Sequence, residues 1–179
     1  MKDVCFLIHG SYGNPYKNFF PYLHKNITKK GYYVIAPQFP IYSLQTYDNW
    51  SNILEQYLNL GLLNEISTII THSLGSIFIV KFLKEHNLRI KKLITVAGFN
   101  NITYEDEHLY NSFYLDNTDK ISVAEDVICI CSTNDKYVPL DRALSFAKML
   151  DGKVIKYDNA GHFSSNDGYQ EFKDILKYL

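Results

Sequence analysis

The 179-residue sequence has few cysteines, and their odd number, three, argues against a framework of disulfide bonds. We predict reduced thiols in buried strands for all three: Cys5, Cys129 and Cys131. No apolar run is long enough to span a membrane, and the N-terminal residues lack the layout of a secretory signal peptide. We therefore expect a cytoplasmic protein without a membrane span.

The sequence also lacks an excess of charge of either sign. Its 18 Lys and Arg residues nearly balance its 19 Asp and Glu residues, which gives a net charge of −1. Because such a balance provides no basic surface for phosphates, we expect no nucleic-acid partner. Hydrophobic residues make up 46% of the chain, which is ordinary for a soluble protein. The length suits a single domain over residues 1–179.

Strand-like and helix-like segments alternate along the whole chain. The predicted strands cover residues 4–9, 32–36, 66–71, 92–96, 127–131 and 153–157. The predicted helices cover residues 18–29, 47–60, 73–86, 140–150 and 168–179. Such alternation is typical of a mostly parallel sheet with helices on both faces, and continuous apolar strands agree with it. We therefore predict a three-layer α/β/α sandwich with about six strands.

The most informative motif is Thr71-His72-Ser73-Leu74-Gly75, between a β-branched strand and an apolar helix. A serine at so tight a turn has a strained backbone, and its hydroxyl projects from the edge of the sheet, as in a nucleophile elbow. The turn requires small neighbours because it brings strand and helix close together. Gly75 meets this need, whereas Thr71 stands where the usual pattern has glycine. We expect His72 to point away from the cleft.

Two further candidates follow later strands, where open α/β sheets bind their ligands. Asp135 lies in the loop after the fifth predicted strand, although an aspartate there can serve only as a turn or cap residue. His162 follows Gly161 after the last strand, and an imidazole pKa of about 6.5 suits proton transfer near neutrality. The chain order Ser73, Asp135, His162 is that of the α/β-hydrolases.

A glycine-containing turn after the first strand supplies candidate donors for an oxyanion. Acyl transfer needs two such donors, and one would be the backbone N–H of Leu74. For the other we prefer the N–H of Ser11, with that of Tyr12 as the alternative. We expect His9 to support this turn.

Residues 98–119 form a long irregular stretch that is rich in aromatic residues. It is either a lid or binding loop, or a short amphipathic helix that covers one sheet face. Four aromatic residues are candidates for lining an apolar acyl pocket: Tyr12, Phe99, Tyr110 and Phe113. This pocket predicts a preference for short or medium apolar acyl groups.

Over nearly its whole length, the sequence resembles the α/β-hydrolases, and more narrowly the small serine hydrolases related to retinoblastoma-binding protein nine and bacterial YdeN. The resemblance is most specific in Thr-His-Ser-Leu-Gly, in Cys-Ser-Thr-Asn-Asp-Lys-Tyr-Val-Pro and in Ala-Gly-His-Phe. It implies a compact fold without a large lid domain and without a metal or organic cofactor. It also implies a small-molecule acyl substrate, with Ser73 as nucleophile, His162 as general base and Asp135 as the group that orients the histidine.

Other functions of the same fold stay open. The chain could be a binding protein that keeps the fold without the chemistry, since fold alone does not decide function. It could also be an acyltransferase or a perhydrolase. Ser73 argues against the dehalogenases and epoxide hydrolases, which have aspartate at the elbow. Protein partners cannot be read from the sequence.

Overall fold

The computed structural model describes residues 3–100, 111–115 and 120–179. Its six strands form one sheet in the order β2-β1-β3-β4-β5-β6, and every neighbouring pair is parallel. The strands are β1 (Val4–Ile8), β2 (Tyr33–Ile35), β3 (Thr68–His72), β4 (Ile90–Val96), β5 (Ala124–Ser132) and β6 (Lys153–Tyr157). The predicted fold class is confirmed.

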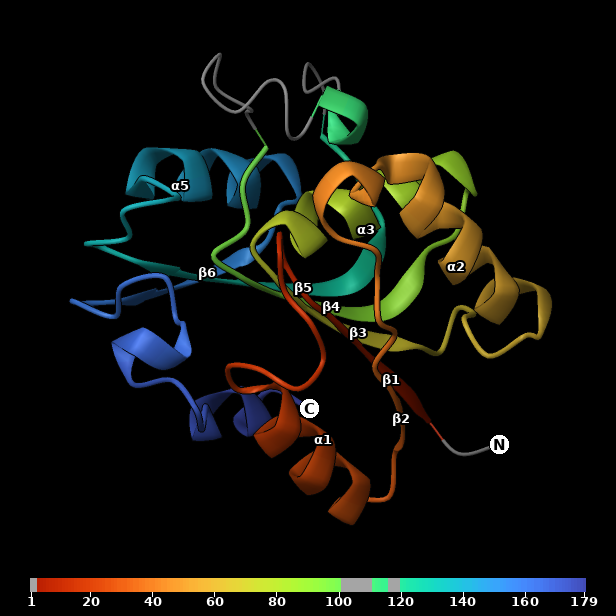
Figure 1. Ribbon diagram of the computed structural model, residues 1–179, viewed down its shortest axis with the longest axis horizontal. Coiled ribbons are helices and arrows are strands. Elements are labelled where there is room, and N and C mark those ends of the chain that lie inside the picture. The colour runs from red at the N-terminus through yellow and green to blue at the C-terminus, as the bar shows by residue number, and fades with distance from the viewer. Residues whose placement is uncertain (1–2, 101–110, 116–119) are drawn as a thin grey trace.

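Helices cover both faces of the sheet (Figure 1). One face carries α2 (Tyr47–Asn59), α3 (Leu74–Glu85) and α5 (Leu140–Met149), and the other carries α1 (Phe20–Lys29) and the C-terminal 3-10 helix η5 (Lys173–Lys177). Three shorter 3-10 helices complete the described elements: η1 (Tyr42–Leu44), η3 (Asn111–Phe113) and η4 (Ser165–Asp167). No large lid domain is inserted among the described residues.

The sheet divides the core into two layers, and β1 contributes to both. Its residues Val4, Phe6 and Ile8 face the layer under α2, α3 and α5, whereas Cys5 and Leu7 face the layer under α1. This alternation follows from the period of two residues in a strand. All five residues are buried, which explains why β1 reads as a continuous apolar run.

The prediction of a helix over residues 168–179 is wrong for most of that segment. Residues 168–179 contain only the 3-10 helix η5. Gly168 is left-handed (φ 89°) and Phe172 has a non-helical backbone (φ −125°, ψ 77°). This path turns the Phe172 ring into the core, where it stacks on Phe163 at 5.4 Å. Burial of this aromatic ring therefore takes precedence over a regular helix.

The described part of the aromatic-rich stretch packs on α2 and α3. Phe113 is fully buried, and its ring lies 5.1 Å from that of Trp50. The Tyr47 N–H donates to Ser112 Oγ (3.0 Å), and Lys81 Nζ donates to the Ser112 carbonyl (2.9 Å). These bonds fix η3 against both helices.

Buried thiols and a mixed surface agree with the sequence analysis. The three cysteines are free and buried, as predicted. Burial raises the pKa of Cys5 to about 12 and that of Cys129 to about 11, so both stay protonated near neutrality.

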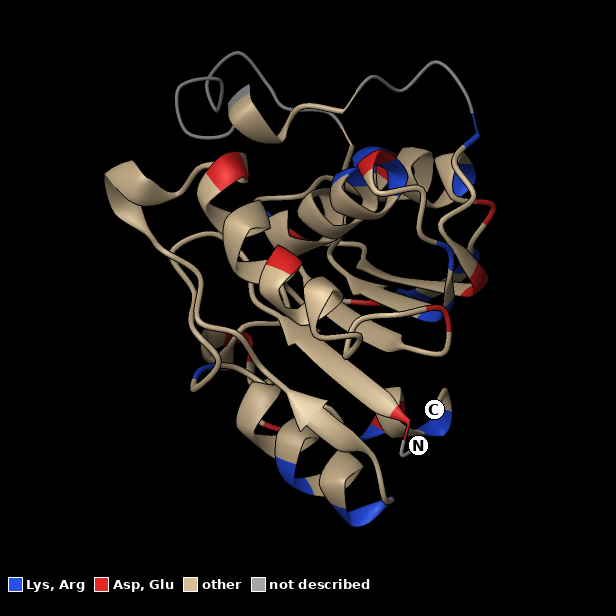
Figure 2. Cartoon of the chain, turned by 90° about the vertical axis from the view of Figure 1, so that its right-hand side faces the viewer, with Lys and Arg blue, Asp and Glu red and all other residues tan. Residues whose placement is uncertain are grey.

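Figure 2 shows Lys and Arg residues alongside Asp and Glu residues on one side of the molecule. Within the described ranges, no helix is long and apolar enough to cross a membrane.

The packing of η3 predicts the cost of truncating Phe113. Phe113→Ala should lower the free energy of unfolding by roughly 3–5 kcal/mol, because it leaves a cavity among large rings. Tyr114→Ala should cost less than about 1 kcal/mol, because Tyr114 is 55% exposed. Urea unfolding of the wild type and both variants measures the difference. Equal effects of the two substitutions would contradict the observed packing.

Candidate active site

Ser73 lies at a sharp turn between β3 and α3. Its backbone has φ 53° and ψ −125°, a conformation that non-glycine residues rarely adopt. The helix begins at the next residue and crosses close to the end of β1. A Cβ atom at Gly75 would lie 2.5 Å from the carbonyl oxygen of His9 and 2.9 Å from that of Ile8. The predicted close approach at Gly75 is therefore confirmed.

Threonine fits at the position where the usual motif has glycine. Thr71 is fully buried within β3, and its hydroxyl forms a 2.7 Å hydrogen bond with that of Ser76. The Ser76 N–H in turn donates to the Ser73 carbonyl (2.9 Å). These bonds join the strand to the first turn of α3, so Thr71 is compatible with the sharp turn at Ser73.

The carboxylate of Asp135 contacts the imidazole of His162. Nδ1 of His162 lies 2.8 Å from Oδ2 of Asp135, whose side chain is only 2% exposed. The other oxygen, Oδ1, accepts the backbone N–H groups of Tyr137 (2.9 Å) and Val138 (3.0 Å). Asp135 thus acts as a turn residue through one oxygen and orients the histidine through the other.

Two polar side chains connect the loop of Asp135 to the loop of His162. Ser132 Oγ accepts the N–H of Ala160 (3.0 Å), and Asn134 Oδ1 accepts the N–H of Gly161 (2.8 Å). Both acceptors lie in the Cys-Ser-Thr-Asn-Asp motif. The motif therefore fixes the backbone just before the histidine as well as supplying the carboxylate that contacts it.

Asp167 fixes the histidine loop from the other side. Its Oδ2 accepts the backbone N–H groups of His162 (3.1 Å) and Ser164 (3.0 Å). Both neighbours of His162 have a left-handed backbone, which Gly161 (φ 59°) adopts readily but which is strained at Phe163 (φ 53°). Such strain persists only where the surrounding contacts determine the backbone.

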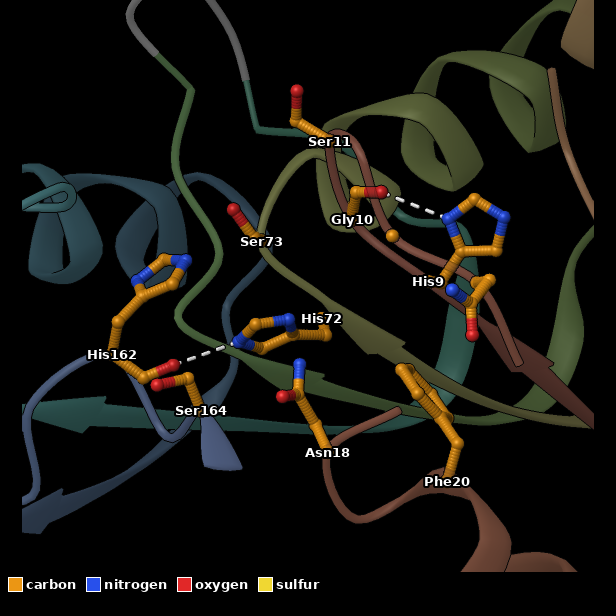
Figure 3. Close-up of a pocket in the computed structure, with 11 residues that line it drawn as sticks. His9, Gly10, Ser11, Asn18, Phe20, His72, Ser73, His162 and Ser164 are labelled. Carbon is orange, nitrogen blue, oxygen red and sulfur yellow. Dashed lines mark hydrogen bonds between the residues drawn. The ribbon is translucent and has the colours of Figure 1, made fainter. Parts of the chain in front are cut away.

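His72 does not point away from the cleft, contrary to our expectation. It lines the cavity beside Ser73, and its Nε2 forms a 2.8 Å hydrogen bond with the carbonyl oxygen of His162 (Figure 3). Because a carbonyl oxygen only accepts, Nε2 carries the proton. Burial, together with repulsion from His162, lowers the pKa of His72 to about 3. His72 is therefore a neutral link between the two loops.

A cavity of about 130 Å³ contains both Ser73 and His162 in its wall (Figure 3). The loop after β1, the turn at Ser73 and the histidine loop enclose it. The described lining residues are His9, Gly10, Ser11, Gly13, Asn14, Asn18, Phe20, His72, Ser73, His162 and Ser164. The cavity thus brings the candidate nucleophile, the candidate base and one candidate oxyanion donor together.

Gln45 holds the turn that carries the candidate oxyanion donors. Its Oε1 accepts the Tyr12 N–H (2.9 Å), and its Nε2 donates to Ser11 Oγ (2.9 Å). The Tyr12 N–H is therefore engaged by Gln45. Leu74 is the first residue of α3. The contact of Gln45 with this turn was not predicted, because a glutamine in a loop gives no local signal of its distant partners.

His9 supports the same turn, as predicted. Its Nδ1 lies 2.8 Å from the Gly10 carbonyl oxygen, and its Nε2 accepts the Phe39 N–H (3.0 Å). Burial lowers the pKa of His9, although the bond to Gly10 partly opposes this effect. Both ring nitrogens thus have structural partners.

Three of the four aromatic residues predicted to bind substrate are described, and none of the three lines the cavity beside Ser73. Phe99 and Phe113 belong to the hydrophobic core, and neither lines the cavity beside Ser73. Tyr12 is 42% exposed, and its ring lies 5.6 Å from that of Tyr42. Tyr110 lies outside the described residues. Among the described residues, no three His, Cys, Asp or Glu side chains form a group that could hold a metal ion.

A profile of the family described as "Serine hydrolase" matches residues 5–179. The chain belongs to the serine hydrolase family. It is 26% identical to "Putative hydrolase YdeN" of Bacillus subtilis (strain 168) over 185 residues, which cover 100% of this chain and 95% of that protein. This agrees with the resemblance found in the sequence motifs.

Solved structures support the same fold. The crystal structure of the ydeN gene product from B. subtilis matches with a TM-score of 0.85 and 22% identity, over 99% of this chain and 97% of that one. Alpha/beta hydrolase domain-containing protein 10 from mouse matches with a TM-score of 0.74 and 15% identity, over 98% and 86%. This member of the serine hydrolase family thus has an α/β-hydrolase fold.

The buried state of His72 predicts acid sensitivity. The pKa of His72 is about 3 in the folded protein and about 6.5 when unfolded, so the unfolded chain binds more protons below pH 6.5. Stability should therefore fall as the pH falls from 6.5 toward 3, with His72 alone contributing a loss of about 2 kcal/mol at pH 5.

Urea unfolding at pH 7.5 and pH 5.0 tests this prediction. His72→Gln removes the titrating group and keeps a side-chain N–H donor, so its loss of stability between the two pH values should be smaller than that of the wild type. His24→Gln is the matched control, because His24 is exposed. The prediction fails if His72→Gln has the same pH dependence as the wild type.

Proposed function

We propose that the protein is a serine hydrolase that cleaves a carboxylic ester, thioester or amide of a small molecule through an acyl-enzyme intermediate. The observation that carries the proposal is the 2.8 Å bond between His162 Nδ1 and Asp135 Oδ2, with His162 and Ser73 in the wall of one cavity. Membership of the serine hydrolase family supports it.

The first step forms the acyl-enzyme. Because Asp135 accepts a hydrogen bond from the Nδ1–H group, the lone pair of the neutral His162 is on Nε2. Nε2 takes the proton of the Ser73 hydroxyl while Ser73 Oγ attacks the substrate carbonyl. The backbone N–H groups of Leu74 and Ser11 donate to the oxyanion. Collapse of the tetrahedral intermediate breaks the bond to the leaving group, which receives the proton from His162.

The second step releases the acyl group. His162 takes a proton from water, and the resulting hydroxide attacks the ester carbon of the acyl-enzyme. A second oxyanion forms in the same place. Its collapse breaks the bond to Ser73 Oγ, which recovers a proton from His162. Asp135 stabilises the imidazolium that exists transiently in both steps.

A fluorophosphonate probe tests the proposal directly, because it reacts covalently with activated serines. The wild type should be labelled, and Ser73→Ala should abolish labelling while the protein stays folded by circular dichroism. Ser122→Ala is the matched control, because Ser122 is exposed beside a cavity that does not contain Ser73. Absence of labelling in well-folded wild type would favour a binding protein and overturn the proposal.

Gln45 should affect the chemical step more than substrate binding. Gln45→Leu removes both bonds to the Ser11–Tyr12 turn, and the new side chain has a similar size. The kcat for hydrolysis of a 4-nitrophenyl ester should therefore fall about 10- to 100-fold, with a smaller change in KM. Gln45→Glu keeps an acceptor for the Tyr12 N–H and should recover part of the loss.

Steady-state kinetics of the two Gln45 variants provides the measurement. The control is Gln56→Leu, a change on α2 at an exposed residue whose side chain donates to the Asn52 carbonyl. A rise in KM with kcat unchanged would contradict a role for Gln45 in placing the oxyanion donor.

A further inference from the structure

The cavity beside Ser73 is small, and polar and apolar groups both line it. An apolar cavity of about 150 Å³ holds a benzene ring, so 130 Å³ suits an acyl group of roughly four to six heavy atoms. Its lining residues include the polar Asn14, Asn18 and Ser164 as well as the apolar Phe20. A plain alkyl chain would leave these polar groups without partners.

The amide of Asn18 has a fixed orientation. Its Oδ1 accepts both the backbone N–H (2.9 Å) and the hydroxyl (3.2 Å) of Ser165. Because a backbone N–H only donates, the oxygen must be at this end, and Nδ2 is at the other. Figure 3 shows Nδ2 of Asn18 directed toward His72 and the interior of the site. Nδ2 has no hydrogen-bond partner among the described residues.

Asn14 repeats this arrangement on the loop after β1. Its Oδ1 accepts the Tyr16 N–H (2.9 Å), so its amide nitrogen is likewise left to donate. Of the described lining residues, none is Lys or Arg. The cavity therefore provides N–H donors without a countercharge, which suits an uncharged acceptor oxygen better than a carboxylate.

We propose that this cavity binds a short, uncharged acyl group with an acceptor oxygen beyond the scissile carbonyl, and that Nδ2 of Asn18 donates to that oxygen. The inference rests on the proposed function, because it assumes that the acyl group lies beside Ser73. It replaces the apolar acyl preference that the abundance of aromatic residues suggested.

Two esters of nearly equal size separate the alternatives. The methoxyacetyl and butyryl esters of 4-nitrophenol differ by one ether oxygen in place of a methylene group. The ratio of their kcat/KM values, divided by the ratio of their rates of hydrolysis by hydroxide, removes the difference in intrinsic reactivity. For the wild type, the corrected ratio should be at least about tenfold in favour of methoxyacetyl.

Two variants of Asn18 assign the preference to its amide nitrogen. Asn18 has φ 53°, which Asp and Gly both tolerate. Asn18→Asp keeps an acceptor for Ser165 and replaces the donor by an oxygen, whereas Asn18→Gly removes the side chain. Both should bring the corrected ratio close to one. The matched control Asn52→Asp, at an exposed position on α2, should leave it unchanged.

The fluorophosphonate probe keeps the two proposals distinguishable. A labelled wild type whose corrected ratio is near one or favours butyryl overturns this inference alone. A ratio that stays high in both Asn18 variants overturns it as well, since the preference then has another origin. Absence of labelling overturns the proposed function and this inference with it.

Discussion

The close approach between the start of α3 and the end of β1 is the constraint on which the rest of the site depends. At Gly75 the two backbones leave no room for a side chain, with the His9 carbonyl 2.5 Å from where a Cβ would lie. The helix can therefore begin immediately after Ser73 only if the serine takes its strained conformation. A Cβ at Gly10 would in turn lie 2.9 Å from the Cβ of Ser73, so the loop after β1 is equally close.

This constraint places the candidate nucleophile and the candidate oxyanion donors at one point. Leu74 opens α3, where backbone N–H groups have no partner within the helix and the helix dipole is positive. The loop after β1 reaches the same point, and Gln45 holds it there. The strained turn thus orients a hydroxyl and also supplies an electropositive edge beside it.

Strand order alone would not bring the base to the nucleophile. The order β3-β4-β5-β6 puts two strands between the turn at Ser73 and the loop of His162. Hydrogen bonds between loops bridge this distance. The carboxylate of Asp135, which follows β5, contacts His162, and His72 at the end of β3 bonds to the carbonyl of the same residue. Because His72 is neutral, this link carries no charge that would compete with the imidazole of His162 for Asp135.

Sequence patterns predicted the elements and the positions of the key loops because both depend on local periodicity. The range predicted for β6 agrees with Lys153–Tyr157, and β1 ends one residue before its predicted end. The prediction of a C-terminal helix was wrong because tertiary packing buries Phe172, and local periodicity does not show such packing. Gln45, Asn18 and Asp167 were not recognised, since each acts through partners on other loops or through backbone groups that the sequence does not display.

The aromatic residues illustrate why composition alone does not show which side chains line a pocket. An aromatic ring in a sequence can lie in the core, on the surface or in a pocket, and hydrophobicity alone does not distinguish these places. Here Phe113 is in the core, while the exposed ring of Tyr137 lies 5.0 Å from that of His162. Loops supply much of the cavity wall, and two of their asparagine side chains also hold backbone, since Asn14 accepts the Tyr16 N–H and Asn18 accepts that of Ser165. The residues that build these loops therefore also contribute polar groups to the cavity, which links the geometry of the site to the acyl group that it would accept.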